Sequence, residues 1–229
     1  MSDRQGYWRQ PADSRPGLTV PLGSVRQRYP EITGFVLAGG ASKRMARSKA
    51  HLLIGHETMV ERQIHLLRSL CRSVAVLGPP ENFRSIGVPV LADRFPGRGP
   101  LAGLYTGLLH THSEYNLFLS CDLPFMSVRF LRYLCERALD GGADATVPES
   151  RRHGFHPLCA VYRRRARWGI RASLLAGQNK VSSFFWRVRR QVLTTGEMAR
   201  AGFGLRVFDN MNTLEEYEAV KKWIAVARS

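Results

Sequence analysis

Short apolar runs that alternate with helical segments are the feature that most constrains the fold of this chain. Seven short runs, most of them apolar, are predicted to be strands: 32–38, 73–77, 88–91, 116–120, 144–147, 158–162 and 205–208. Four segments between them are predicted to be helices: 57–70, 100–109, 128–139 and 164–176. Buried strands separated by helices are typical of a mostly parallel sheet that is covered on both faces.

The two ends of the chain are predicted to differ. Residues 1–30 contain four prolines, three glycines and few large aliphatic residues, so we expect a disordered arm. Residues 31–229 are expected to form a single α/β domain. Its last helix is predicted to start after Thr213, because Thr213 and Glu216 have the spacing of a capping box.

The net charge of +16 first suggests a nucleic-acid or membrane-surface protein. The excess is local, however: residues 151–206 hold 13 basic and 1 acidic residue, whereas residues 31–150 hold 13 and 11. This distribution argues against a uniformly basic nucleic-acid coat. The sequence has no apolar run long enough for a transmembrane helix and no signal-peptide core at its start, so we expect a cytoplasmic protein. Its four scattered cysteines predict reduced thiols and no zinc site.

A glycine loop follows the first predicted strand. Gly39 and Gly40 allow backbone N–H groups to face an anion, and Ser42, Arg44 and Lys49 add a hydroxyl group and positive charge nearby. This combination suits a triphosphate. The GxxxxGK[ST] and GxGxxG fingerprints are both absent. The simpler alternative is a tight glycine turn with a solvated basic flank.

Five segments, in order and spacing, resemble the molybdenum cofactor guanylyltransferase family. They are LAGGASKRM from Leu37, DRFPGRGPLAG from Asp93, CDLPF from Cys121, HPL from His156 and FDNMNT from Phe208. The resemblance covers about residues 32–220. It implies a Rossmann-like three-layer sandwich with a mostly parallel, mixed central sheet, as in nucleotide-diphospho-sugar transferases. It also implies a nucleotide-binding half at 31–150 and an acceptor-binding half at 151–229.

The resemblance implies roles for individual residues. Asp122 would bind Mg²⁺ and the nucleotide, with Lys49 and Arg44 as further catalytic residues. The nucleotide-binding set would be Leu37, Ala38, Gly39, Gly40, Ser42, Lys49, Asp93, Gly103 and Asp122. The acceptor-binding set would be His156, Pro157, Lys180, Asn210 and Asn212. Alternatively, Asp122 caps a strand end and Asp93 forms a turn.

The implied reaction is transfer of GMP from GTP to the phosphate of molybdopterin, or of molybdenum-molybdopterin, with release of pyrophosphate. The expected partners are other cofactor-biosynthesis proteins and acceptor molybdoenzymes. Binding to a membrane or to nucleic acid is not expected. The arginines of 151–206 would then form either a binding site for the anionic acceptor or a solvated surface. Ala46 and Ser48 replace the family's glycine and aspartate, which puts the shape and activity of the glycine loop in doubt.

Two other functions stay open. One is a related nucleotidyltransferase with another nucleotide or acceptor, such as a molybdopterin cytidylyltransferase or a sugar-phosphate nucleotidyltransferase. The other is a degenerate, non-catalytic protein that binds nucleic acid or a partner enzyme through the basic residues of 151–206.

Overall fold

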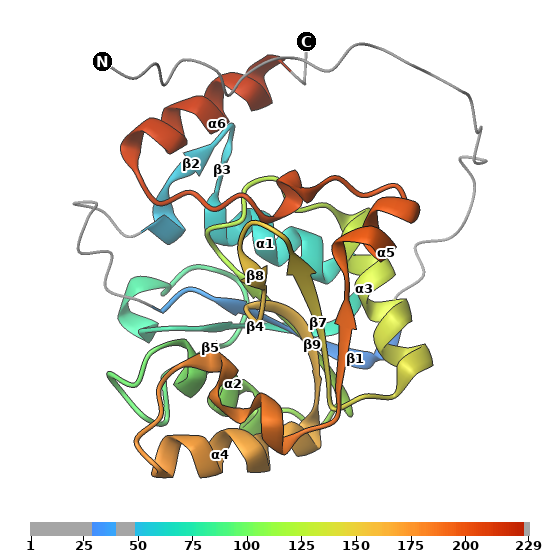
Figure 1. Ribbon diagram of the computed structural model, residues 1–229. Coiled ribbons are helices and arrows are strands. Elements are labelled where there is room, and N and C mark those ends of the chain that lie inside the picture. Colours follow the sequence, from blue (N-terminus) through green and yellow to red (C-terminus); the bar gives the residue numbers. More distant parts are fainter. Residues whose placement is uncertain (1–28, 40–48, 227–229) are drawn as a thin grey trace, which may run out of the picture.

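A mixed sheet forms the centre of the molecule in a computed structural model that describes residues 29–39 and 49–226 (Figure 1). The strand order is β10-β7-β9-β6-β1-β4-β5, and β8 pairs with β7. Only β9 runs antiparallel to its neighbours along this order, so the sheet is mostly parallel, as predicted. The strands are β1 (Tyr29–Leu37), β4 (Cys71–Leu77), β5 (Val90–Leu91), β6 (Tyr115–Ser120), β7 (Ala145–Ser150), β8 (Gly154–Phe155), β9 (Cys159–Arg163) and β10 (Arg190–Leu193).

Helices cover both faces of the sheet and complete the predicted three-layer sandwich. Helices α1 (Met59–Arg68) and α3 (Val128–Gly141) lie on one face, and α2 (Pro100–His110) and α4 (Arg167–Leu175) lie on the other (Figure 1). Side chains of β1 alternate between the two cores: Ile32 and Val36 pack on the α1–α3 side, and Phe35 and Leu37 on the α2–α4 side. This is why the strand is apolar throughout.

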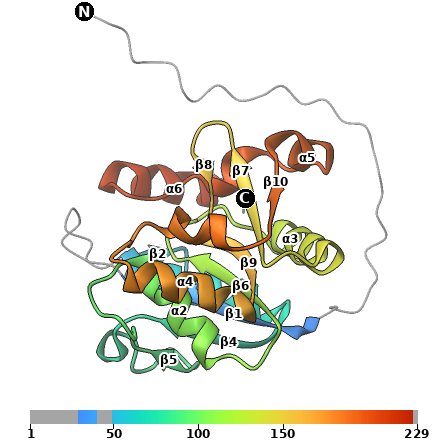
Figure 2. The ribbon, with the colours of Figure 1, turned by 60° about the horizontal axis from the view of Figure 1, so that its bottom comes forward.

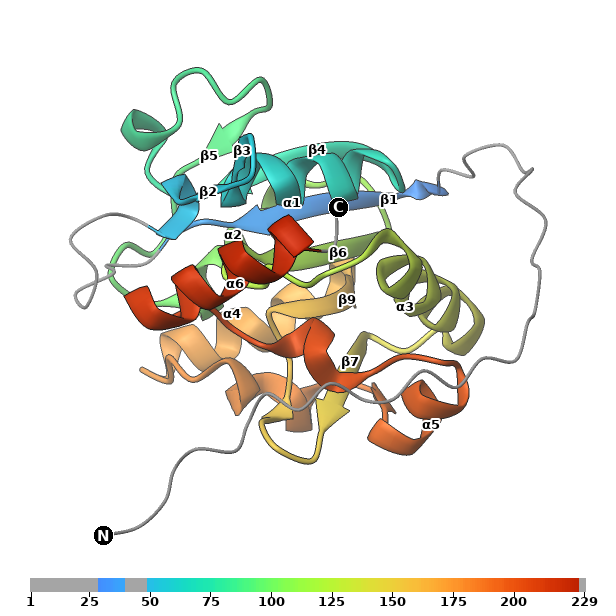
Figure 3. The ribbon, with the colours of Figure 1, turned by 90° about the horizontal axis from the view of Figure 1, so that it is seen from above.

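The last helix, α6 (Leu214–Val226), lies over a small hairpin of β2 (Leu53–Ile54) and β3 (Glu57–Thr58) (Figures 1 and 3). Tyr217 Oη donates to the carbonyl of Leu53 at 2.9 Å. The predicted capping box is confirmed: Glu216 N donates to Thr213 Oγ1, and Thr213 N donates to Glu216 Oε2, both at 3.1 Å. The cap fixes the segment just before α6, and this segment carries Asn210 and Asn212.

In the second half, one predicted strand is wrong and one strand was not predicted. Residues 205–208 form a 3-10 turn, η5 (Leu205–Phe208), because Phe208 packs edge-on against Phe130 rather than joining the sheet. The edge strand is β10 instead, and its first two residues, the exposed Arg190 and the half-buried Gln191, carry no apolar signal. Helix α5 (Thr195–Arg200) follows it, as Figure 2 shows.

The predicted arm lies almost entirely outside the described residues. Its last two residues belong to β1, and Tyr29 is buried, with its hydroxyl donating to Glu136 Oε1 at 2.9 Å. The four cysteines are free thiols, as predicted, and three are buried. Within 29–39 and 49–226, no helix has the length and apolar character needed to cross a bilayer.

Candidate active site

The carboxyl ends of the central parallel strands meet at one edge of the sheet. Ala38 N donates to the carbonyl of Leu77 at 2.9 Å, and Cys121 N donates to the carbonyl of Leu37 at 3.1 Å. The segments that follow β1, β4 and β6 therefore leave the sheet side by side. Ligands of open α/β sheets bind outside this edge.

Asp93 lies between the glycine segment after β1 and the first turn of α2. A Cβ added to Gly39 would lie 3.9 Å from Asp93 Oδ2, and one added to Gly103 would lie 3.6 Å from Asp93 Oδ1. The carboxylate is half-buried, and this burial raises its pKa. The structure thus brings together four predicted nucleotide residues: Leu37, Gly39, Asp93 and Gly103.

Asp122 lies in the turn that follows β6. Its main-chain carbonyl accepts a hydrogen bond from Met211 N at 2.9 Å, which joins this loop to the segment before α6. Within the described part of the chain, its carboxylate has no hydrogen-bond or ion-pair partner. A half-buried carboxylate at this edge is available to a ligand.

Two side chains of α1 hold the Asp122 loop in place, and the sequence analysis missed both. Gln63 is fully buried and donates from Nε2 to the carbonyl of Leu123 at 2.9 Å. Arg62 donates from Nε to the carbonyl of Pro124 at 3.2 Å. The sequence does contain one sign of this role: Gln63 is a polar residue on the apolar face of a predicted helix.

Lys49 meets the C-terminal segment. It lies in the short turn η1 (Lys49–His51), and its Nζ donates to Asn212 Oδ1 at 2.5 Å. Asn212 N donates to Glu216 Oε2 at 2.6 Å, so the cap of α6 fixes the partner of Lys49. A residue predicted to hold phosphate therefore contacts one predicted to hold the acceptor.

Cys121 lies beside both charged groups. Burial, and then the charge of Asp122, raise the pKa of its thiol to about 12, while the Lys49 ammonium acts in the opposite direction. The thiol is protonated at neutral pH, so Cys121 does not supply a thiolate nucleophile.

His156 is a packed, hydrogen-bonded histidine. Its ring stacks on Phe208 with centroids 3.9 Å apart, and Nε2 lies 2.8 Å from Ser150 Oγ. Burial, and then the charge of His153, lower the pKa of His156 to about 4. Among the described residues, no group of three or more potential ligands surrounds the His153–His156 pair, so a metal site there has no support. The neighbouring Pro157 carbonyl accepts from Tyr162 Oη at 2.7 Å.

A cavity of about 300 Å³ opens beside the Asp122 loop. Asn210 and Asn212 line it, as does Arg206, whose guanidinium lies 4.2 Å from the Phe125 ring centre and 4.3 Å from that of Trp223. The other lining residues are Arg152, His153, Asp209, Glu216, Ala219 and Val220. Lys180 lies apart from this cavity, next to Asn179, which accepts from Arg98 Nε at 2.7 Å.

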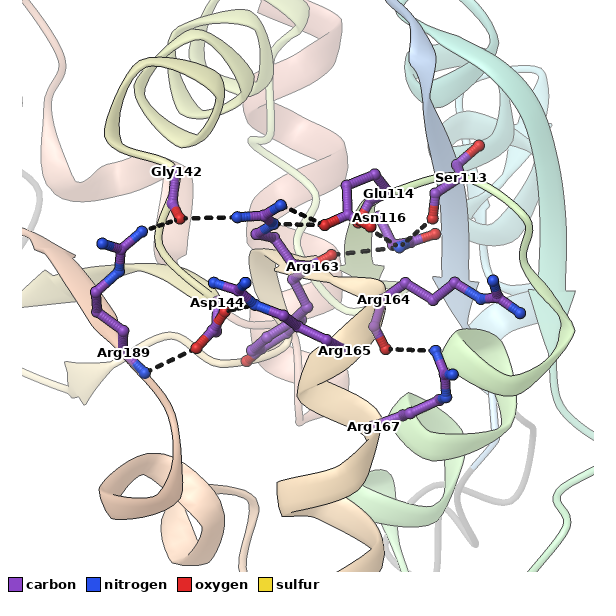
Figure 4. A network of polar contacts seen from close by, with 11 residues as sticks. Ser113, Glu114, Asn116, Gly142, Asp144, Arg163, Arg164, Arg165, Arg167 and Arg189 are labelled. Carbon is purple, nitrogen blue, oxygen red and sulfur yellow. Dashed lines mark hydrogen bonds and ion pairs between the residues drawn. The ribbon is translucent and has the colours of Figure 1, made fainter.

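Several arginines of residues 151–206 lie at the amino edge of the sheet, where Arg163 pairs with Tyr115 at the start of β6, and Figure 4 shows their polar contacts. Arg163 ends the antiparallel strand β9 and pairs with Glu114 at 2.5 Å, while Arg165 pairs with Asp144. Arg189 N donates to the second oxygen of Asp144 at 3.0 Å. Arg163 and Arg165 neutralise local carboxylates at the amino edge of the sheet, and Arg189 lies beside them, so the structure does not bring these three arginines to the candidate active site.

The rest of the predicted phosphate loop lies outside the described residues. It comprises the predicted site residues Gly40, Ser42 and Arg44 and the departures Ala46 and Ser48. Their roles stay predictions.

Solved structures share this fold. A structure titled molybdopterin-guanine dinucleotide biosynthesis protein A from Archaeoglobus fulgidus superimposes with a TM-score of 0.74 at 18% identity, covering 85% of this chain and 99% of that one. A protein from Aquifex aeolicus, titled only as putative, gives 0.64 at 26% identity over 79% and 93% of the two chains.

Sequence relatives are closer. A probable molybdenum cofactor guanylyltransferase of Pelotomaculum thermopropionicum is 36% identical over 187 residues, covering 80% of this chain and 88% of the relative. The molybdenum cofactor guanylyltransferase of Desulfosudis oleivorans is 30% identical over 86% and 98% of the two chains. Residues 34–192 match the family described as the MobA-like NTP transferase domain. The chain belongs to this family and is a nucleotidyltransferase.

Proposed function

We propose that this protein transfers GMP from GTP to the terminal phosphate of molybdopterin, or of its molybdenum-loaded form, and releases pyrophosphate. The names of the relatives support the choice of substrates. The observation that carries the proposal is the meeting of Lys49 with Asn212, because it joins the predicted phosphate loop to the predicted acceptor segment.

The reaction needs no protein nucleophile. An oxygen of the acceptor phosphate attacks the α-phosphorus of GTP in line. The new phosphorus–oxygen bond forms as the bond to the bridging oxygen of pyrophosphate breaks. Positioning and charge stabilisation supply most of the catalysis in such transfers.

Among the described residues, Lys49 has the position needed for this charge stabilisation. Its ammonium has three N–H donors, so it can keep the hydrogen bond to Asn212 while it also donates to the phosphate oxygens and stabilises the charge that develops on the leaving pyrophosphate. The exposed backbone at Gly39 lets the nucleotide approach closely, because it carries no side chain. Asp93 would accept hydrogen bonds from guanine N–H groups or from the ribose hydroxyls.

Mg²⁺ fits the donor set around Asp122. Mg²⁺ commonly takes one or two carboxylates together with substrate phosphates and water, rather than a closed protein cage. The half-buried Asp122 carboxylate has no hydrogen-bond or ion-pair partner in the described ranges, so its oxygens are available to the ion. Asp122 would hold the ion, which supplies charge neutralisation on the nucleotide phosphates.

The acceptor would lie in the cavity lined by Asn210 and Asn212. Amide side chains suit the hydrogen-bonding edge of a pterin, and Arg152 can bind two oxygens of a phosphate. His156 stacks on Phe208, the neighbour of the cavity-lining Asp209, and with Pro157 would support this side of the cavity. We also propose that the enzyme is located in the cytoplasm. Its proposed partners are other cofactor-biosynthesis proteins and acceptor molybdoenzymes.

A single assay tests the assignment. Purified protein is incubated with Mg²⁺, molybdopterin and GTP, CTP, ATP or UTP in turn, and pyrophosphate release is measured. We expect release with GTP that depends on molybdopterin. Release with CTP alone would instead indicate a cytidylyltransferase, and release with none of them a non-catalytic protein.

A further inference from the structure

Two tryptophans and a leucine are exposed on the outer helical layer of the molecule. Trp168 and Leu175 of α4 are 60% and 62% exposed, and Trp186 of the turn η4 (Val181–Arg187) is 70% exposed. Only four other large apolar side chains in the described ranges are exposed. Large apolar groups gathered at one place on a surface mark an interaction site.

These side chains lie on two elements that touch each other. Trp168, Arg171 and Leu175 follow a helical spacing of three and then four residues, so they share the outer face of α4. A Cβ added to Gly169 would lie 3.3 Å from Arg187 Cβ, so α4 contacts η4 at the residues that follow Trp168 and Trp186 in sequence. We call Trp168, Arg171, Leu175, Trp186 and Arg187 the α4–η4 surface.

The surface is positively charged. Arg187 lies over the Trp186 ring at 3.8 Å, and Arg167 lies over the Trp168 ring at 4.6 Å. The sequence from 151 to 196 contains no acidic residue. The carboxylates Glu114 and Asp144 pair with Arg163 and Arg165, near the start of α4, rather than with Arg171 or Arg187.

The surface is also firmly supported and distant from the C-terminal helix. Ile170 and Leu174, on the inner face of α4, are buried in the core below the sheet. Figure 1 shows α4 at the bottom of the molecule and α6 at the top. A partner on the α4–η4 surface would leave the cavity beside α6 open.

We propose that the α4–η4 surface binds a protein partner that presents an apolar side chain among carboxylates. Tryptophan and arginine are the residues most enriched at the energetic centres of protein interfaces. Their arrangement here, apolar groups with a basic rim, complements an acidic rim on the partner. A nucleic acid is a weaker match, because each tryptophan already has an arginine over its ring and Leu175 offers nothing to a phosphate.

Defined polymers test the partner's chemistry with the full-length protein. The probes are a fluorescent random copolymer of glutamate and tyrosine, polyglutamate and poly(U), compared by fluorescence anisotropy. The copolymer should bind about tenfold more tightly than polyglutamate, because only it offers apolar side chains. Trp168→Ala/Trp186→Ala should remove this difference, and Arg171→Glu/Arg187→Glu should abolish binding of both polymers.

Matched control variants distinguish binding at the α4–η4 surface from binding that depends only on the overall positive charge of the protein. Arg200→Glu/Lys222→Glu makes the same charge change on exposed residues of α5 and α6 and should leave the tenfold preference intact. Pyrophosphate release should be unchanged in the tryptophan variant, which also shows that it is folded. Tighter binding of poly(U) that is lost in the same variants would make this a nucleic-acid surface. Equal binding of the two acidic polymers would also overturn the proposal.

Discussion

The ammonium of Lys49 donates a hydrogen bond to the side-chain oxygen of Asn212, a residue 163 positions further along the chain. Glu216 Oε2 accepts from the backbone N–H of both Asn212 and Thr213, at 2.6 and 3.1 Å. The cap that starts α6 therefore also holds the partner of Lys49. The position of the lysine depends on the end of the chain being folded.

This contact makes Asn212 a positioning residue for Lys49. We expect Lys49→Met to lower kcat by about 10²–10³-fold, as loss of a stabilising charge does. Asn212→Ala should lower kcat by about tenfold because the lysine loses its position. If Asn212 acts through Lys49, the double variant should be no worse than Lys49→Met alone. Multiplied losses, with a raised KM for molybdopterin, would instead show an independent acceptor contact.

Asp122 carries the predicted metal role. Asp122→Asn keeps the size of the side chain and removes its charge, so we expect at least a hundredfold lower turnover and a higher Mg²⁺ requirement. The melting temperature should stay nearly constant, since the carboxylate has no partner in the described part of the chain. The control is Asp140→Asn, at an exposed position on α3. Equal activity of the two variants would contradict the metal role.

Gln63 links stability to the site. Gln63→Leu keeps the volume of the side chain but leaves the carbonyl of Leu123 buried without its donor. We expect a loss of about 1–3 kcal/mol in the free energy of unfolding, measured by urea denaturation. Turnover should fall too, because the Asp122 loop loses a support. Gln178→Leu, at an exposed position after α4, should change neither quantity.

The sequence predicted the buried strands well and the edges of the sheet poorly. The central strand β1 is apolar on both faces because it packs against two cores, and this pattern is visible in the sequence. The edge strand β10 starts with Arg190 and Gln191, which need no burial. In residues 205–208, Phe208 is buried among aromatic rings rather than in the sheet, and an apolar side chain does not reveal which partner buries it.

The candidate site shows the same limit. Asp93 and Asp122 could be placed because parallel strands end at one edge of a sheet. The arginines could not: Arg152 and Arg163 are close in sequence, yet β9 runs antiparallel and carries Arg163 to the opposite edge. The contact of Lys49 with Asn212 depends on how distant segments pack, and no local pattern encodes it.

His156 predicts a pH dependence of stability. Its pKa is about 4 in the folded protein, below the ordinary value of 6.5. Between these values the unfolded chain binds a proton that the folded protein does not, so stability falls as pH drops from 6.5 towards 4. We expect His156 to contribute a loss of about 2 kcal/mol, allowing for its partial exposure. The measurement is urea denaturation of the wild type and His156→Gln at several pH values, and only the wild type should show this component.

Two glycines of α2 face different surroundings, and alanine substitution should separate binding from stability. A Cβ on Gly107 would lie 2.8 Å from two atoms of the buried Phe118 ring, which packs at 4.9 Å from Phe35 and cannot easily shift. We therefore expect Gly107→Ala to destabilise the fold by about 1–3 kcal/mol and to leave the KM for GTP unchanged.

A Cβ on Gly103 would instead lie 3.0 Å from the end of the Leu37 side chain and 3.6 Å from Asp93 Oδ1. The leucine methyl can move, so the cost to stability should be small, but the movement alters the contact surface around Asp93. We expect Gly103→Ala to raise the KM for GTP several-fold, measured by pyrophosphate release, with a melting temperature above that of Gly107→Ala. An unchanged KM in Gly103→Ala would show that the nucleotide does not lie between Asp93 and α2.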